Sequence, residues 1–166
     1  ITALTQHNGL LWIATRGGIA VMDYGGTPGN KTDDRWANFT RSNSGLVDNE
    51  TSSIGVDAQG YLWVGTSKKT NDGEAGSGVN VLDFRGTPFS RTDDRWMTYT
   101  SNNGLAHNAV RSVSEWGNAQ VALGTRTGLS VLNYGASPFT TSDNKWQKYT
   151  VAGRLAGSMV TGIADI

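Results

Sequence analysis

The stretch LWIATRGGIAVMDYGGTPGNKTDDRWANFT, residues 11–40, decides the fold, because similar segments occur three times in the chain. The second copy is split into LWVGT at residues 62–66 and GVNVLDFRGTPFSRTDDRWMTYT at residues 78–100. The third is VALGTRTGLSVLNYGASPFTTSDNKWQKYT at residues 121–150. A repeat of this length in a strand-like pattern predicts a radial or stacked array rather than an ordinary globular core.

The spacing of equivalent residues gives a base period of about 50 residues. Trp36, Trp96 and Trp146 are 60 and 50 residues apart, and each follows a proline by eight residues. Two insertions account for the difference. One residue is added in the linker after Thr40, and nine are added in the second repeat between strands, in the segment 67–77.

Composition excludes several classes of protein. Lys and Arg together number 14, as do Asp and Glu, so the formal net charge is zero. The chain therefore lacks the excess of positive charge that is typical of nucleic-acid-binding proteins. No apolar run approaches the roughly 20 residues of a membrane span, so we expect no direct membrane insertion. The chain has no cysteine, which excludes disulfides and zinc–thiolate sites.

Each repeat contains four candidate strands, which are short, rich in β-branched residues and bounded by glycine or polar residues. Four antiparallel strands repeated at this period are the unit of an all-β β-propeller, one blade per repeat. A β-solenoid, the structural alternative, repeats at shorter intervals. The expected units are blade 1 at about 1–40, blade 2 at about 52–100, blade 3 at about 110–150 and the start of a fourth blade at about 160–166.

The pattern LWVGT…GVNVLD…W…YT…NGL…N…SV resembles the two-component regulator propeller repeat over essentially the whole chain. The resemblance implies a bacterial protein of the periplasm or the extracellular space, whose blades form part of a larger ring of about seven. It also implies a sensor domain or a secreted binding module. Propellers host many activities, so the resemblance indicates the fold more strongly than the function.

The two ends of the chain overlap in repeat position. Residues 160–166 repeat the role of residues 1–6, which gives four innermost strands but three of each other strand. Either the array continues beyond this segment, or copies associate as a homo-oligomer in which the surplus strand completes a neighbour's incomplete blade.

Linkers that enter an innermost strand, and turns between the second and third strands, share one face of a propeller. Polar side chains there suit recognition of a polar small molecule or glycan. The ligand-binding candidates at these positions are Asn49, Glu50, His107, Asn108, Arg16 and Arg126. The alternative for the two asparagines is that they cap the linker turns locally. Trp116 stands alone in a turn of the third repeat and is a further contact candidate.

Recurring acidic pairs such as Asp33–Asp34 and Asp93–Asp94, and the segment Asn71–Glu74, contain ligand types that Ca²⁺ prefers. The EF-hand spacing is absent, and turn formation explains the acidic pairs equally well. We therefore expect no metal site and no cofactor.

No nucleophile elbow, zinc motif or phosphate loop occurs, so the sequence predicts no catalytic residues. The expected function is non-catalytic ligand sensing or protein interaction. The alternatives are a structural or assembly scaffold on a surface or in a filament, and, third, a propeller lyase that uses His107 on the channel face.

Overall fold

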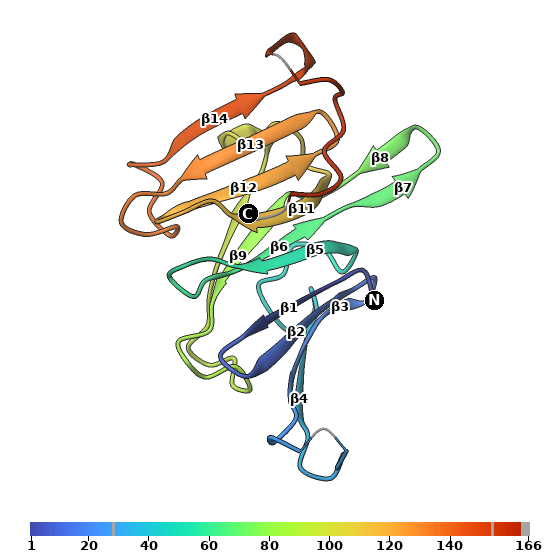
Figure 1. Cartoon of the computed structure of the whole chain (residues 1–166), viewed down its shortest axis with the longest axis vertical. Coiled ribbons are helices and arrows are strands. Elements are labelled where there is room, and N and C mark those ends of the chain that lie inside the picture. The colour runs from blue at the N-terminus through green and yellow to red at the C-terminus, as the bar shows by residue number, and fades with distance from the viewer. Residues whose placement is uncertain (28, 154, 164–166) are drawn as a thin grey trace.

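A computed structural model describes residues 1–27, 29–153 and 155–163, and it contains three four-stranded antiparallel sheets (Figure 1). The first sheet, blade 1, consists of β1 (Ala3–His7), β2 (Leu10–Thr15), β3 (Gly18–Asp23) and β4 (Arg35–Phe39). Blade 2 consists of β5 (Thr51–Val56), β6 (Leu62–Thr66), β9 (Val79–Asp83) and β10 (Arg95–Tyr99). Blade 3 consists of β11 (Val110–Glu115), β12 (Gln120–Thr125), β13 (Gly128–Asn133) and β14 (Lys145–Tyr149).

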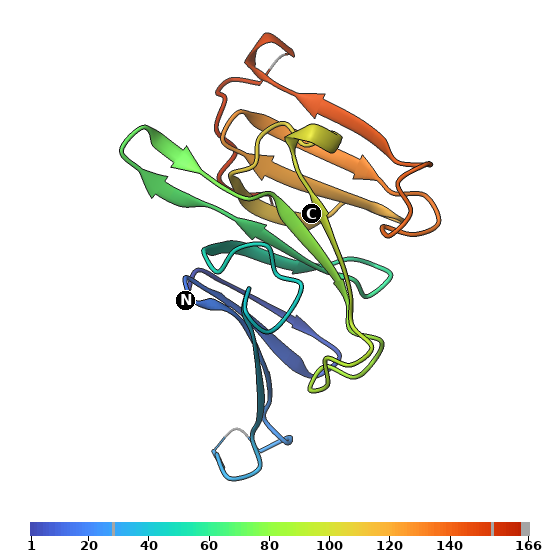
Figure 2. The same cartoon turned by 180° about the vertical axis from the view of Figure 1, so that it is seen from behind.

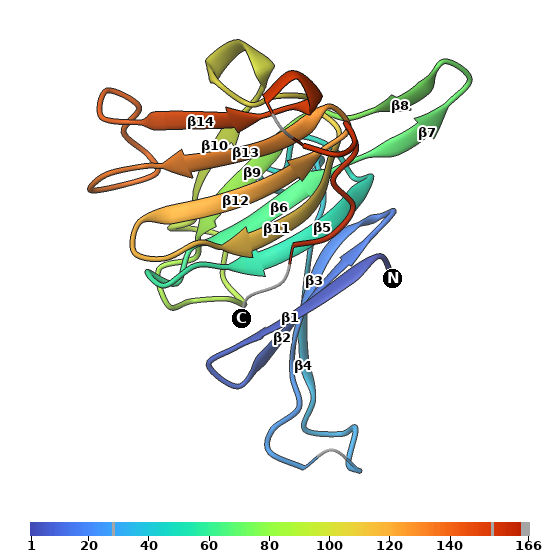
Figure 3. The ribbon, with the colours of Figure 1, turned by 45° about the horizontal axis from the view of Figure 1, so that its top comes forward.

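Within each sheet the four strands lie side by side in chain order, which confirms the blade predicted from the repeat. The first strands of the three blades are also neighbours, since β1 packs beside β5 and β5 beside β11 (Figure 3). The first strand of each blade is therefore innermost, and the tryptophan-bearing fourth strand is outermost. Two single-turn 3-10 helices, η1 (Ser101–Asn103) and η2 (Val151–Gly153), follow β10 and β14.

The core lies at the two junctions between blades, because strand alternation sends apolar side chains to both faces of each sheet. At the first junction Trp12, Phe39 and Leu46 pack against Leu62 and Leu82. The second junction contains the equivalent set from blades 2 and 3, with Trp63, Tyr99, Leu105, Val121 and Leu132 buried together. The repeated aromatic and leucine columns therefore serve as packing between sheets.

The threonine column closes the turn between the second and third strands. The Oγ1 atoms of Thr15, Thr66 and Thr125 donate to a glycine carbonyl oxygen across the turn, at 2.9, 2.8 and 2.7 Å. In blades 1 and 3 only two residues lie beyond this bond. In blade 2 the same bond, from Thr66 to Gly78, closes the base of the inserted segment.

The inserted segment 67–77 is a β-hairpin of β7 (Lys68–Thr70) and β8 (Gly73–Ala75), where the sequence predicts only a loop. Figure 2 shows this hairpin projecting well beyond the ends of the other strands. A segment rich in glycine and polar residues has no alternating apolar pattern, so its strands are not visible in the sequence.

The expected start of a fourth blade at 160–166 stays a prediction. Residues 160–163 form no strand, and residues 164–166 lie outside the described part of the chain. The Val160 amide nevertheless donates to the Thr125 carbonyl oxygen at 3.1 Å. Val160 also lies over Gly124, as Val110 lies over Gly65 in the preceding blade.

No helix in residues 1–27, 29–153 and 155–163 has the length and apolar character needed to cross a bilayer.

Candidate ligand-binding site

The innermost strands begin at one end of the blades, which we call the mouth. The turns after β2 and β12 and the β7–β8 hairpin lie at this same end, since the second strand of each blade runs antiparallel to the first. Side chains from three blades therefore meet at the mouth. This arrangement was predicted from the sequence for the linkers and turns.

A cavity of about 520 Å³ opens at the mouth, and we call it the mouth cavity. Blade 1 contributes Arg16 from its β2–β3 turn, and blade 2 contributes Glu50 and Ser52 at the start of its innermost strand. The hairpin supplies Lys69 and Glu74, and blade 3 supplies Arg111 from β11; Thr2, Thr51, Ser67, Lys68 and Thr161 complete the lining.

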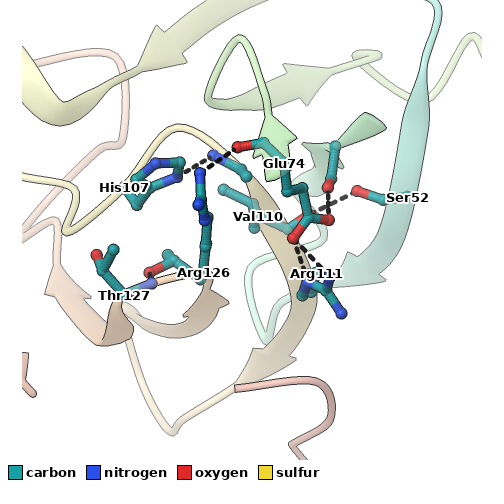
Figure 4. A network of polar contacts seen from close by, with 10 residues as sticks. Ser52, Glu74, His107, Val110, Arg111, Arg126 and Thr127 are labelled. Carbon is teal, nitrogen blue, oxygen red and sulfur yellow. Dashed lines mark hydrogen bonds and ion pairs between the residues drawn. The ribbon is translucent and has the colours of Figure 1, made fainter. Parts of the chain in front are cut away.

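Glu74 and Arg111 form the central ion pair of this cavity (Figure 4). Arg111 Nε and Nη2 each lie 2.6 Å from Glu74 Oε2, and the Ser67 hydroxyl donates to Oε1. Burial raises the pKa of Glu74, but the hydrogen bond from Ser67 and the pairing with Arg111 outweigh it and leave this pKa below its ordinary value. Glu74 is therefore ionised near neutral pH and holds the hairpin of blade 2 against blade 3.

Lys68 joins the hairpin to the linker that precedes β5. Its Nζ atom lies 3.9 Å from the carboxylate of Asp48, which also accepts from the Ser77 hydroxyl at 2.9 Å. Burial raises the pKa of Asp48, yet its hydrogen bonds and the nearby Lys68 bring it below the ordinary value. By contrast, Arg16, Lys69 and Glu50 form no ion pair with any other residue that the structure describes.

His107 and Asn108 line a second, smaller cavity of about 290 Å³ on the other side of Glu74. His107 Nδ1 accepts the Ala109 amide at 2.9 Å, which places the ring proton of a neutral His107 on Nε2. Burial, followed by the charge of Arg126, lowers the pKa of His107, so the ring is neutral near pH 7. Arg126 Nη1 donates to the Glu74 backbone oxygen at 2.9 Å, so Arg126 lies against the β7–β8 hairpin (Figure 4).

The two asparagines of the linkers bond to local backbone. Asn49 Oδ1 accepts the Arg41 amide at 2.8 Å, and Asn108 Oδ1 accepts the Ser101 amide at 2.7 Å. These are the capping bonds that the sequence allows as an alternative to ligand binding. A ligand could reach only the remaining amide atoms of these side chains.

Trp116 lies away from the other candidates. It follows the last residue of β11, at the end of blade 3 opposite the mouth, and is 50% exposed. The structure thus brings Arg16 and Glu50 together in one cavity, places His107, Asn108 and Arg126 beside it, and leaves Trp116 separate. The ligand-binding role of all these residues stays a prediction.

Among the residues that line the mouth cavity, Arg16 and Glu50 were sequence-based ligand candidates, whereas others, including Ser52 and Arg111 on the innermost strands, were not. Arg111 could have been found, because it is a charged residue near the start of an innermost strand. The equivalent residue of blade 2 is the uncharged Ser52. A charged side chain at an innermost position, together with an acidic insertion one blade earlier, is the available signal.

The acidic loops between the third and fourth strands use their carboxylates in turns. Asp93 accepts the Thr87 hydroxyl at 2.8 Å, Asp33 accepts the Thr27 hydroxyl, and Asp143 accepts the Ala136 amide at 3.2 Å. Among the described residues no group of three or more His, Asp or Glu side chains is arranged to hold a metal ion.

Comparisons with known proteins agree with the resemblance seen in the sequence. Residues 45–68 match the family model described as two component regulator propeller. This match covers the linker before β5, strands β5 and β6, and the start of the inserted segment. No curated protein matches the chain.

Solved structures of low identity also match. One is the extracellular domain of the hybrid two component system BT3049 from B. thetaiotaomicron, with 20% identity, TM-score 0.40, and coverage of 94% of this chain and 24% of that one. PorZ, a bacterial surface component of the type-IX secretion system of Porphyromonas gingivalis, has 15% identity, TM-score 0.43, and coverage of 98% and 29%. The extracellular domain of BT4673 from B. thetaiotaomicron has 15% identity, TM-score 0.38, and coverage of 96% and 24%. The chain thus spans about a quarter of the length of these proteins.

Proposed function

We propose that this chain is part of an extracytoplasmic β-propeller that binds a polar small molecule or glycan in the mouth cavity, without catalysis. The observation that carries the proposal is the convergence of Arg16, Glu50 and Arg111, one from each blade, on a single cavity. Polar groups on a rigid scaffold, presented by loops and strand ends, are typical of ligand sites.

The balance of charge in the cavity favours a ligand with both donors and acceptors. Arg16 and Lys69 offer cationic donors and Glu50 offers a free carboxylate, while Glu74 and Arg111 neutralise each other. The match of residues 45–68 to a regulator propeller supports a sensing role and a place outside the cytoplasm.

The geometry of the histidines supports a non-catalytic function. His7 ends β1 and His107 precedes β11, so they lie at opposite ends of the blades. The Nδ1 atom of His107 accepts a backbone amide, and no catalytic role for this ring is needed to explain its position.

The proposal is tested by thermal unfolding with maltotriose, cellotriose and trigalacturonate as probes. A ligand that binds only the folded chain raises the melting temperature with concentration. Arg16→Ala and Lys69→Ala should each weaken the binding of the probe that shifts the melting temperature by about tenfold, as expected for loss of a charged hydrogen bond. Lys148→Ala, on the outermost strand of blade 3, is the matched control and should change nothing. If no probe shifts the melting temperature, or if the mouth variants respond like the control, the proposal is wrong.

A second candidate function, an assembly scaffold, is favoured by a different observation. On the outer face of blade 1, Leu4 is 54% and Trp36 is 52% exposed, whereas the equivalent Trp96 and Trp146 pack against a preceding blade. Concentration-dependent association measured by light scattering, abolished by Trp36→Ser and unaffected by the three sugars, would favour this function.

A further inference from the structure

A third cavity, of about 610 Å³, lies between blades 1 and 2 at the end opposite the mouth, and we call it the lower cavity. It is lined by Leu10, Phe84 and Phe89, with Asn8, Asp23 and Arg35 among its polar residues. None of these residues belongs to the mouth cavity. The strand bounds explain the position, since β2 and β6 begin at this end and β3 and β9 end there.

The same position between blades 2 and 3 is filled by larger side chains. Tyr61 stands there at the repeat position of Leu10, and its ring contacts Tyr134 and Phe139 at centroid distances of 6.2 and 5.7 Å. Gln59 replaces Asn8 and hydrogen bonds to the Ala119 amide at 3.3 Å. The lower cavity is therefore the space that an aromatic ring and a longer amide occupy one blade later.

A carboxylate is also missing from the first junction. At the second junction Asp57 Oδ2 accepts from Trp63 Nε1 at 2.7 Å and from the Tyr134 hydroxyl at 2.9 Å. By strand register the residue equivalent to Asp57 is His7, because His7 pairs with Leu10 as Asp57 bonds to Tyr61. The Nε2 atom of His7 lies 2.9 Å from Asn8 Nδ2, at the rim of the cavity.

The indole of Trp12 consequently has a buried donor without an acceptor. Trp12 is 0% exposed, and its Nε1 has no hydrogen-bond partner among the described residues. A buried N–H group without an acceptor is costly, so a group that supplies an acceptor would bind favourably. Trp12 does not itself line the lower cavity; its ring centroid lies 5.3 Å from that of Phe84, which does, so a ligand reaches the indole only when the Phe84 side chain shifts.

The charges around the lower cavity also allow an anion. The guanidinium carbon of Arg35 lies 4.3 Å from the centroid of the Phe89 ring, and Arg35 has no ion pair within the described part of the chain. Asp23, the one acidic residue in the lining, is engaged by the Gly25 amide at 3.0 Å. A ring bound beside Phe84 and Phe89 would thus have one cation, Arg35, and one carboxylate, Asp23, within the same lining, and an anion would bind on the Arg35 side.

We propose that the lower cavity binds a small aromatic carboxylate, whose ring takes the place of the Tyr61 side chain and whose carboxylate takes the place of Asp57. The ring packs against Leu10 and Phe89, and a shift of the Phe84 side chain lets the carboxylate accept from Trp12 Nε1 while it faces Arg35. This site is separate from the mouth cavity, and it holds whether or not the mouth binds a glycan.

The test uses 4-hydroxybenzoate, which joins a phenol ring to a carboxylate, and 4-hydroxybenzyl alcohol as its neutral counterpart. The chain has six tryptophans, so the indole Nε1–H resonances of the ¹⁵N-labelled protein form a short set that Trp12→Phe assigns. Addition of 4-hydroxybenzoate should shift the Trp12 indole resonance. The alcohol should bind at least about tenfold more weakly, because it lacks the charged acceptor.

Two variants identify the site. Leu10→Tyr introduces the side chain that fills the second junction, so it should abolish binding while the melting temperature is kept or raised. Trp12→Phe keeps an aromatic ring but removes the indole N–H donor, and should weaken the binding of 4-hydroxybenzoate by about tenfold. Arg16→Ala, in the mouth cavity, is the control and should leave the affinity unchanged.

Three results would overturn the proposal. The first is an unmoved Trp12 indole resonance at saturating 4-hydroxybenzoate. The second is equal affinity for the acid and the alcohol. The third is a folded Leu10→Tyr variant that binds as well as the natural chain.

Discussion

Asp94 and Asn144 occupy the same repeat position, one residue before the outermost strand, but they meet different neighbours. Asn144 Nδ2 donates to the Tyr99 hydroxyl of the preceding blade at 3.1 Å. The residue equivalent to Tyr99 one blade earlier is Phe39, which has no hydroxyl, and both carboxylate oxygens of Asp94 are buried without a hydrogen-bond partner among the described residues. Burial, together with the neighbouring Asp93 carboxylate, raises the pKa of Asp94 to about 6.

Asp94→Asn should therefore stabilise the fold at pH 7.5. The folded-state pKa lies above the ordinary value of 3.8, so the natural chain loses stability as pH rises from about 4 through about 6. The gain should be of order 1 kcal/mol, less than the full shift implies, because Asp94 as a whole residue is only half-buried and nearby solvent screens the charge of its carboxylate.

Thermal or urea unfolding between pH 4 and pH 7.5 measures this effect. Asp72→Asn removes the same charge from an exposed turn of the hairpin and should leave the pH dependence unchanged. An Asp94→Asn variant that keeps the pH slope of the natural chain would contradict the assignment.

At the scale of elements, the β7–β8 hairpin depends on a few contacts with the blades. It has three residues in each strand and is bound to blade 3 through Glu74, Arg111 and Arg126. An isolated two-stranded hairpin is marginal in water, so these contacts determine its order. The Glu74 side chain is 10% exposed and that of Arg111 is 26% exposed, so water screens this pair less than an ordinary surface ion pair, and removal of one partner leaves a largely buried charge unpaired.

Arg111→Met should loosen the hairpin without unfolding the blades. Loss of a charged hydrogen bond predicts roughly tenfold faster amide hydrogen exchange in β7 and β8, with little change in β11. Because the pKa of Glu74 is lowered, the natural chain should keep this protection above the ordinary value of 4.5 and lose it as the pH falls below that value. The control is Arg16→Met, a residue of the same cavity without an ion pair; equal exchange rates in the two variants would argue against the anchor.

At the scale of the whole molecule, the two junctions between blades differ in their polar contacts. The second junction contains the buried Asp57, which binds Trp63 and Tyr134, whereas the first contains the lower cavity and has no such carboxylate; each junction has one indole, Trp12 or Trp146, without a partner among the described residues. Burial and the Asp57 charge raise the pKa of the Tyr134 hydroxyl, so this hydroxyl stays protonated and donates to Asp57. The array therefore has a firmly bonded junction and a more open one.

Tyr134→Phe should make the second junction resemble the first. Removing one donor to a buried carboxylate should cost about 1–3 kcal/mol of unfolding free energy. Tyr61→Phe removes a hydroxyl that has no hydrogen bond to the described residues and should cost much less, so the pair of variants isolates the polar contacts of the Tyr134 hydroxyl, which meets Gln59 Oε1 as well as Asp57. Similar losses in urea unfolding of the two variants would show that ring packing, rather than the hydroxyl, matters at this junction.

Much of this architecture is predictable from the sequence, because it depends on periodicity. The columns of Thr, Trp and Leu predict the sheets, the order of strands and the face on which Arg16 and Glu50 lie. The ion pair between Glu74 and Arg111 is not predictable in this way, since 37 residues separate the two and neither belongs to a repeated column. The lower cavity depends on the volumes of Leu10 and Tyr61 in otherwise equivalent surroundings, and becomes visible only when the two junctions are compared in space.

The bond between Thr66 and Gly78 has a consequence for how such a protein can change. It closes the base of the hairpin as the equivalent bonds close two-residue turns in the other blades. The four-stranded sheet is therefore the same whether two residues or eleven lie between the bonded threonine and glycine. Lengthening a loop whose ends are already held together costs little entropy. The turn between the second and third strands of each blade is thus an insertion site at the mouth, where a segment can be gained, lost or grafted without a change in the sheets. Novel recognition can therefore arise by insertion, one blade at a time.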